Sequence, residues 1–364
     1  MLERIVRQII RSRWIVMMAV LAICTFGVWN FQNLPIDAVP DITNVQVQIN
    51  TEAPGYSPLE SEQRVTFPIE TALAGLPQLS YTRSLSAYGL SQVTVVFEEG
   101  TDIYFARNLV NSRLGSIKNQ LPADLEPEMG PISAGLGEIF MYTVRAEEGA
   151  VQPNGEPYDL FALREIQDWI IKRQLILVDG VTEVNTSGGF EKQYHVMPDP
   201  AKMLRWGITL PELLSALWDN NINQGAGYIE RNGQQLMVRS PGQLRTIEDI
   251  EHVSIVSRNS IPVLVKDVAE VSIGRELRTG AGTRAGKEAV IGTAFMLLGE
   301  NSRTVARDVA ETLEEINATL PEGVVAEALY DRTVLVDNTI ATVEENLAIG
   351  ALLVIVVLFL LLGN

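Results

Sequence analysis

Two apolar segments stand near the two ends of this 364-residue chain, and a long, mostly polar region separates them. The first covers about Trp14–Phe31, and the second, Leu347–Leu362, contains no charged residue. Each is close to the length that a helix needs to cross a bilayer core about 30 Å thick. We therefore expect transmembrane helices at 14–32 and 339–362, with a large domain between them on one side of a lipid bilayer.

Positive charge predicts which side of the membrane that domain occupies. Four arginines precede the first apolar segment, and no basic residue lies close to its far end. Because cytoplasmic flanks of membrane helices are rich in Arg and Lys, we expect both chain ends in the cytoplasm and Asn44–Asp337 on the opposite side. Apolar residues at helical spacing within residues 1–13 predict an amphipathic helix at the cytoplasmic membrane surface. A cleaved signal peptide is the alternative, but residues 30–35 contain no small-x-small cleavage site.

The composition limits the partners and the chemistry of the outer domain. The formal charge is −17 although the N-terminus is basic, which argues against nucleic acid and is compatible with cations. The single cysteine, Cys24, lies in the first apolar segment, so the outer domain must be stable without disulfides. The two histidines are far apart, and no Ser–His–Asp or Cys–His combination stands out. The sequence therefore predicts no enzyme, no catalytic residue and no cofactor.

The order of predicted elements in the outer domain indicates repeated α/β modules. The first set is Asn44–Asn50, a helix capped by Ser57, Tyr81–Leu85, Gln92–Phe97, a helix capped by Asp102, and Ile139–Val144. This is the βαββαβ order of a ferredoxin-like unit. A helix at Asp159–Leu175 and strands at Val181–Asn185 and Gln193–Met197 begin a second set, and strand-rich segments after it predict an inserted subdomain. The expected fold class is thus an α+β membrane protein with two transmembrane helices and ferredoxin-like modules between them.

Five segments of the chain resemble the heavy-metal branch of the resistance-nodulation-division efflux pump family. They are Leu34–Thr43, Ala53–Glu60, Tyr88–Thr94, Gly100–Arg107 and Gly130–Glu138. The likeness runs through essentially the whole chain and is greatest to the cobalt–zinc–cadmium pumps. It implies a homotrimer in the bacterial cell inner membrane that uses proton import to export divalent zinc, cobalt or cadmium, with nickel as a further candidate. The pump would work with a periplasmic membrane-fusion adaptor protein and an outer-membrane channel protein.

The resemblance also assigns roles to parts of the outer domain. Residues 40–130 would form one periplasmic pore module, and 131–176 with 274–330 a second. Residues 177–273 would form an α+β docking subdomain that faces the outer-membrane channel. Within it, Asn220–Gly242 would be an arm that reaches into the neighbouring protomer. That region is polar and glycine-rich and reads as a hairpin turning at Asn232-Gly233.

Glu138 is the one candidate metal ligand. It follows Gly135-Leu136-Gly137, and glycines let the backbone approach a bound species closely. A carboxylate suits zinc or cobalt, whereas Cu(I) prefers sulfur ligands. By resemblance, the glutamate of this motif binds metal in a periplasmic cleft together with ligands from a second half of the pump. The competing interpretation from the residues alone is a solvated glutamate at the entry to a strand.

The resemblance indicates what lies beyond this chain. The chain stops at Gly363-Asn364, directly after the second apolar segment, so we expect it to be the N-terminal part of a longer protein. The family's proton-carrying carboxylates belong to a later membrane helix, and neither apolar segment here contains an acidic residue. We therefore expect the fragment to be inactive alone. The alternatives are a Cu(I)/Ag(I) pump of the same family, a pump for amphipathic organic molecules, and a two-span, membrane-anchored periplasmic sensor or binding protein.

The expected topology can be tested with a membrane-impermeant thiol reagent. In a Cys24→Ser background, cysteines introduced at Asn154 and Asn232 should react in intact spheroplasts, because both positions lie in the outer domain. Protection of both cysteines until the cells are lysed would contradict the assignment.

Overall fold

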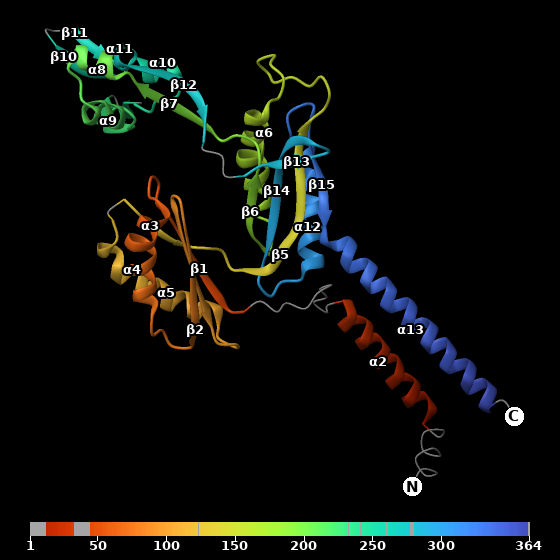
Figure 1. Cartoon of the computed structure of the whole chain (residues 1–364). Helices are drawn as coiled ribbons and strands as arrows, with labels where there is room; N and C mark the ends of the chain where they lie inside the picture. Colours follow the sequence, from red (N-terminus) through yellow and green to blue (C-terminus); the bar gives the residue numbers. More distant parts are fainter. Residues whose placement is uncertain are drawn as a thin grey trace. The chain divides into compact units, whose positions relative to one another are not determined.

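The computed structural model describes residues 12–32, 44–122, 124–231, 233–240, 242–258, 261–276 and 280–362 (Figure 1). The chain divides into two compact units. The first contains Met1–Ala150, Gln167–Ser187 and Ile291–Asn364, and the second contains Val151–Ile166 and Gly188–Val290. The amphipathic helix expected at residues 1–13 lies outside the described residues except for its last two positions.

Two apolar helices belong to the first unit, α2 (Arg13–Gln32) and α13 (Arg332–Leu362). Among the described residues, α13 is the one helix long and apolar enough to cross a membrane, whereas the apolar stretch of α2 covers Trp14–Gly27. Every side chain from residue 341 to 361 is exposed, as expected for a helix that faces lipid. The first turns of α13 are different, because Val336 is fully buried and Asp337 pairs with Arg303 at 2.6 Å. The helix therefore begins inside the folded domain.

An antiparallel sheet of four strands, in the order β2-β3-β1-β4, forms what we call the first module (Figure 1). Its strands are β1 (Gln46–Glu52), β2 (Leu79–Ala87), β3 (Leu90–Phe97) and β4 (Pro127–Met129). Its helical segments are α3 (Pro58–Ser61), η1 (Glu62–Thr66), α4 (Phe67–Leu73), α5 (Ile103–Ile117) and the short η2 (Lys118–Gln120). This order is that of a ferredoxin-like sandwich, as expected. The fourth strand is β4, however, so the prediction that Ile139–Val144 completes this sheet is wrong.

Alternation along β1 determines which face of the first sheet is covered. Val47 and Ile49 are buried against the helices, whereas the residues between them are half-exposed. Ser57 forms the expected capping box with Glu60 at the start of α3, and Asp102 caps α5 through the amide of Phe105. Pro68 stands in the first turn of α4, directly after the π-helical segment η1. Proline has no N–H to donate to the residue four positions earlier, and the wider π-helical turn occurs where that hydrogen bond is missing.

The second module repeats the same topology with a large insertion. Its strands are β5 (Ser133–Ala146), β6 (Val181–Ser187), β14 (Lys287–Leu297) and β15 (Val324–Asp331), in the order β6-β14-β5-β15. The short strand β13 (Gly282–Arg284) also pairs with β14 and is the fifth strand of this sheet. Its helical segments are α6 (Leu160–Ile166), η3 (Gln167–Ile171), α7 (Lys172–Leu175) and α12 (Ser302–Asn317). In the first module the second and third strands are joined by a tight turn at Gly89, where the backbone φ is +70°. In the second module the corresponding strands, β6 and β14, are separated by the inserted subdomain.

The inserted subdomain makes up most of the second unit. Its elements are β7 (Lys192–Pro198), α8 (Pro200–Trp206), α9 (Leu210–Asp219), β8 (Gln224–Arg231), β9 (Gln234–Ser240), α10 (Ile247–Glu251), β10 (Ser254–Arg258), β11 (Ile261–Leu264), α11 (Val265–Val268) and β12 (Ala269–Arg275). Strand β7 pairs with β12, and the predicted recurrence that placed Gln193–Met197 beside Val181–Asn185 is wrong. The docking subdomain was predicted to begin at 177, whereas β6 pairs with β14 of the second module.

The predicted hairpin of the arm is confirmed as the antiparallel pair β8 and β9. Its turn residue Asn232 lies outside the described residues. Tyr228, Ile229, Leu236 and Met237 on this hairpin are all at least half exposed. They do not belong to the core of the subdomain, which α9, α10, α11 and the neighbouring strands form.

Gly292 on β14 provides a test of packing in the second module. A Cβ at this position would overlap ring atoms of the fully buried Tyr142 on the neighbouring strand β5. We expect Gly292→Ala to lower the free energy of unfolding by about 1–3 kcal/mol, as overpacking commonly does. Gly115→Ala on α5 is the matched control, because nothing lies within 4 Å of its Cβ position and alanine favours a helix. Urea unfolding of both variants in detergent measures the difference, and equal stabilities would contradict the close contact.

Candidate functional site

Glu138 lies on β5 of the second module, between the buried residues Gly137 and Ile139, and its side chain is exposed. The described part of the chain contains no group of three or more His, Cys, Asp or Glu side chains placed to hold a metal ion. The structure therefore does not complete a metal site around Glu138 within that part. An exposed carboxylate on a rigid strand can supply one ligand of a shared site.

A partly buried polar cluster lies in the second module, beside the strand that carries Glu138. Gln167 Nε2 donates to Thr186 Oγ1 at 3.3 Å, and Thr186 Oγ1 donates to Asp168 Oδ1 at 2.6 Å. The ring of Tyr142 packs beside this cluster, and burial raises the pKa of its hydroxyl well above the usual range, with the charge of Asp168 acting in the same direction. Strand β6 is thus linked to η3 by hydrogen bonds that are partly shielded from water, and Tyr142 of β5 packs beside them.

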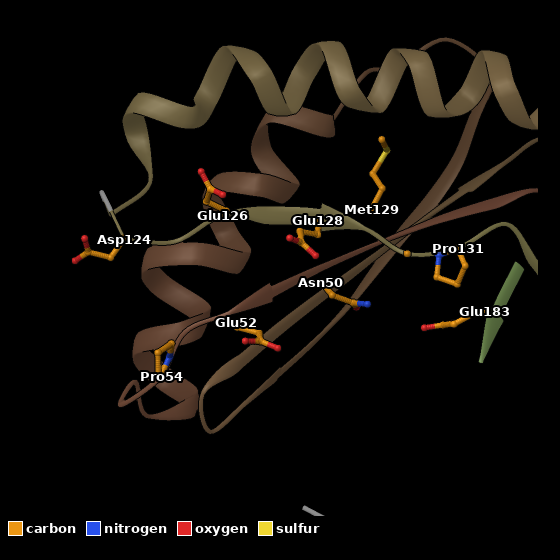
Figure 2. A pocket seen from close by; sticks show the side chains of 10 residues that line it. Asn50, Glu52, Pro54, Asp124, Glu126, Glu128, Met129, Pro131 and Glu183 are labelled. Carbon is orange, nitrogen blue, oxygen red and sulfur yellow. The ribbon is translucent and has the colours of Figure 1, made fainter. Parts of the chain in front are cut away.

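An open cleft of about 760 Å³ lies on the first unit and is lined by five carboxylates (Figure 2). We call it the acidic cleft. Its lining residues are Asn50, Glu52, Pro54, Asp124, Glu126, Glu128, Met129, Gly130, Pro131 and Glu183. Lys, Arg, His and aromatic residues are absent from this described lining. A concave surface with one sign of charge raises the local concentration of the opposite ion, so the acidic cleft attracts cations.

The polar face of the first sheet builds one wall of the acidic cleft. Residues 48, 50 and 52 of β1 point to the same face, opposite to the buried face. Asn50 pairs directly with Gln92 of β3 and with Glu128 of β4. Its Oδ1 accepts hydrogen bonds from Gln48 Nε2 at 3.0 Å and from Gln92 Nε2 at 3.2 Å. These bonds fix the amide, whose nitrogen points toward the side of Glu183 in Figure 2.

One carboxylate of the lining, Glu126, forms an ion pair with a lysine. Lys118 Nζ lies 2.9 Å from Glu126 Oε1, and the hydrogen bond and charge of Lys118 hold the pKa of Glu126 below its usual range. The pair is exposed, so it contributes little to stability. Its consequence is electrostatic: Glu126 stays ionised at pH values where an ordinary glutamate begins to bind protons.

Sequence reasoning did not find the acidic cleft, and the reason is the long-range pairing that builds it. Strand β4 has only three residues and a proline at its start, so it carries no clear pattern. Its antiparallel pairing with β1 places Glu128 opposite Asn50, more than seventy positions earlier in the chain. Glu138, which the sequence did single out, is not among the residues that line the acidic cleft.

Comparison with known sequences gives one consistent result. The sequence profile of the AcrB/AcrD/AcrF family matches residues 5–364. Protein HelA of Legionella pneumophila is 59% identical over 100% of this chain and 34% of its own length. The cobalt-zinc-cadmium resistance protein CzcA of Cupriavidus metallidurans is 56% identical, again over 100% of this chain and 34% of its own.

The fold comparison agrees with the sequence comparison. A crystal structure of a heavy metal efflux pump superposes with a TM-score of 0.88 at 32% identity, covering 97% of this chain and 35% of that one. This chain therefore spans about a third of the length of the relatives that it matches.

Proposed function

The chain belongs to the AcrB/AcrD/AcrF family, and on that premise we propose that it is the N-terminal part of an inner-membrane transporter that exports divalent heavy-metal cations in exchange for protons. The observation that carries the proposal is 56% identity along the whole chain to a protein named for resistance to cobalt, zinc and cadmium. Zinc, cobalt or cadmium would be the substrate, and no cofactor is needed. The activity is transport, with no enzymatic reaction.

Glu138 is the proposed metal ligand of this part. Its carboxylate is exposed on β5 and therefore accessible to a cation from solvent. Divalent zinc and cobalt accept carboxylate oxygens, usually together with further ligands. Those further ligands would come from the remaining two thirds of the transporter. The acidic cleft would concentrate cations close to the first module by its charge, without binding one tightly.

The proposed assembly follows the two modules and the insertion. Helices α2 and α13 would both cross the inner membrane and hold the modules and the inserted subdomain in the periplasm. The pore would be formed by three protomers, with 40–130 as one pore module and 131–176, β6 and 274–330 as the other. The docking subdomain would be the part of 177–273 that follows β6 and would face the outer-membrane channel, and a membrane-fusion adaptor would complete the complex.

The chemistry of the acidic cleft favours divalent cations over the alternatives. A Cu(I)/Ag(I) pump needs thioether or thiolate ligands, and the described lining contains one thioether, Met129, among five carboxylates. A cleft for amphipathic organic molecules needs aromatic walls, which the described lining does not have. A membrane-anchored sensor would leave the match to a transporter family over residues 5–364 without an explanation.

Removing the charge of Glu138 tests the proposed ligand in the complete transporter. Glu138→Gln keeps the size and polarity of the side chain, and we expect the apparent affinity for zinc or cobalt to fall roughly tenfold or more. Glu148→Gln, in the exposed turn after the same strand, is the matched control and should transport normally. Metal resistance of cells and metal uptake into inverted vesicles measure the effect. Unimpaired transport by Glu138→Gln at normal expression would show that this glutamate is not a required ligand.

The hairpin β8–β9 provides a separate test of assembly. Its exposed apolar side chains would be covered only by a neighbouring protomer, so deletion of Ile229–Met237 should convert the trimer to monomers that stay folded. Removal of Pro153–Gly155, a surface turn, should leave the trimer intact and serves as the control. Light scattering after size exclusion in detergent gives the mass, and circular dichroism reports folding. A trimer that survives the hairpin deletion refutes the role of the arm.

A further inference from the structure

Residues 130–132, which we call the connector, join the last strand of the first module to the first strand of the second. Both backbone groups of Gly130 are bonded within the first module. Its N–H donates to the carbonyl of Gln48 on β1 at 2.8 Å. Its carbonyl accepts from Nη1 of Arg107 on α5 at 2.6 Å. Gly130 is buried, so these two bonds satisfy groups that water does not reach easily.

The other end of the connector is bonded within the second module. The carbonyl of Ile132 accepts a hydrogen bond from the N–H of Leu298, which follows β14, at 3.3 Å. Between these two anchored residues stands Pro131, which is exposed and has no N–H to donate. Its ring fixes φ, so rotation is left to its ψ and to the backbone angles of the next residue. The freedom between the two modules is concentrated in about one residue.

Arg107 is well placed to hold the first-module end of this connector. It stands in α5 next to Ala106, and both Ala106 and Val110 are buried in the core of the first module. The backbone of Arg107 is therefore rigid, and its half-buried side chain spans from the helix to the end of β4. A charged guanidinium makes a stronger hydrogen bond to a carbonyl than a neutral donor does. Strand β4 has only three residues, so this bond is a large part of what fixes its end.

The acidic cleft crosses the connector. Gly130 and Pro131 line it, the carboxylates of β1 and β4 stand on one side, and Glu183 of β6 stands on the other (Figure 2). Rotation at Pro131 would therefore change the separation between Glu183 and the carboxylates of the first module. Rotation that began earlier, within β4, would instead disrupt the wall that carries Glu128.

We propose that Arg107 is a positioning residue that clamps Gly130 to the first module, so that the acidic cleft opens and closes by rotation at Pro131 while its β4 wall stays intact. The clamp itself is a property of this chain. Its consequence for transport rests on the proposed function, because it assumes that the acidic cleft changes width as cations pass. Arg107 touches no cation in this arrangement and acts only through the backbone of Gly130.

The experiment compares three variants in the complete transporter. Arg107→Ala removes the donor, and Arg107→Lys keeps a charged donor with a shorter reach. Arg113→Ala removes the same charge from an exposed position on the same helix and is the matched control. Hydrogen exchange of peptides covering residues 127–132 reports the clamp directly, because the amide of Gly130 is bonded to Gln48. Zinc transport into inverted vesicles gives kcat and KM separately.

We expect exchange at 127–132 to accelerate about tenfold or more in Arg107→Ala, since a charged hydrogen bond to a buried carbonyl is lost. Arg107→Lys should restore part of the protection, and Arg113→Ala should match the unmodified protein. In transport, Arg107→Ala should lower kcat with KM unchanged, because positioning is lost and no ligand is removed. A merely electrostatic role would instead lower KM, since a positive charge close to carboxylates would be gone.

Two results would overturn the proposal. One is exchange at 127–132 that is the same in Arg107→Ala and Arg113→Ala, and the other is a change in KM with kcat unaltered. The exchange measurement needs no transport activity. If the complete protein moved no divalent metal at all, the proposed function would fail while the exchange result still decided whether the clamp exists.

Discussion

The structure depends on sheets that are covered by helices on one face only. In β1 this constraint appears as strict alternation, with Val47 and Ile49 buried under the helices and the intervening residues half exposed. A shift of register by one residue would bury Gln48 and Asn50 and expose the core, so the pairing is strongly specified. The same alternation leaves a polar face on the other side. The acidic cleft exists because that face is not covered by helices in this part of the chain.

The insertion in the second module is compatible with this constraint because of where it occurs. It leaves after β6 and returns into β14, and these strands are antiparallel neighbours. The two ends of the insertion therefore lie side by side. Strands β6 and β14 can pair across the insertion in the same way as β2 and β3 pair across the tight turn at Gly89. Gly188, with φ of +78°, stands where the chain leaves, and a side chain there would collide with the backbone of Ala289 and Gly282. Backbone segments approach so closely at this point that only glycine fits.

Local chemistry was predictable from the sequence, and pairing between distant segments was not. Ser57 and Asp102 were identified as helix caps because a capping residue needs only its next three neighbours. Strand β4 was missed because three residues beside prolines have no periodicity to read. The assignment of Ile139–Val144 to the first sheet then followed from that omission.

The candidate site shows the same division between local and distant information. The glycine-rich approach to Glu138 is visible in the sequence, which places the strand at Ile139–Val144. In the structure β5 begins earlier, at Ser133, so Glu138 lies inside the strand with its side chain exposed. The convergence of Glu52, Glu128 and Glu183 comes from three strands in two modules, and no local pattern indicates it. The contact of Arg107 with Gly130 likewise joins residues that lie in separate elements. Which backbone group a long side chain reaches in another element is determined by the fold, and the spacing of the two residues in the sequence does not predict it.

Helix α13 has a mechanical consequence. It contains 31 residues without a break, which at 1.5 Å per residue gives a rod about 46 Å long. Its first turns are fixed to α12 by the Arg303–Asp337 pair and by the buried Val336, and it continues directly from β15. A helix that is fixed at its first turns can tilt at its apolar end only if it bends or if the second module moves with it. A small displacement of the apolar end would therefore reach the second sheet as a torque on β15, with no loop between them to absorb it.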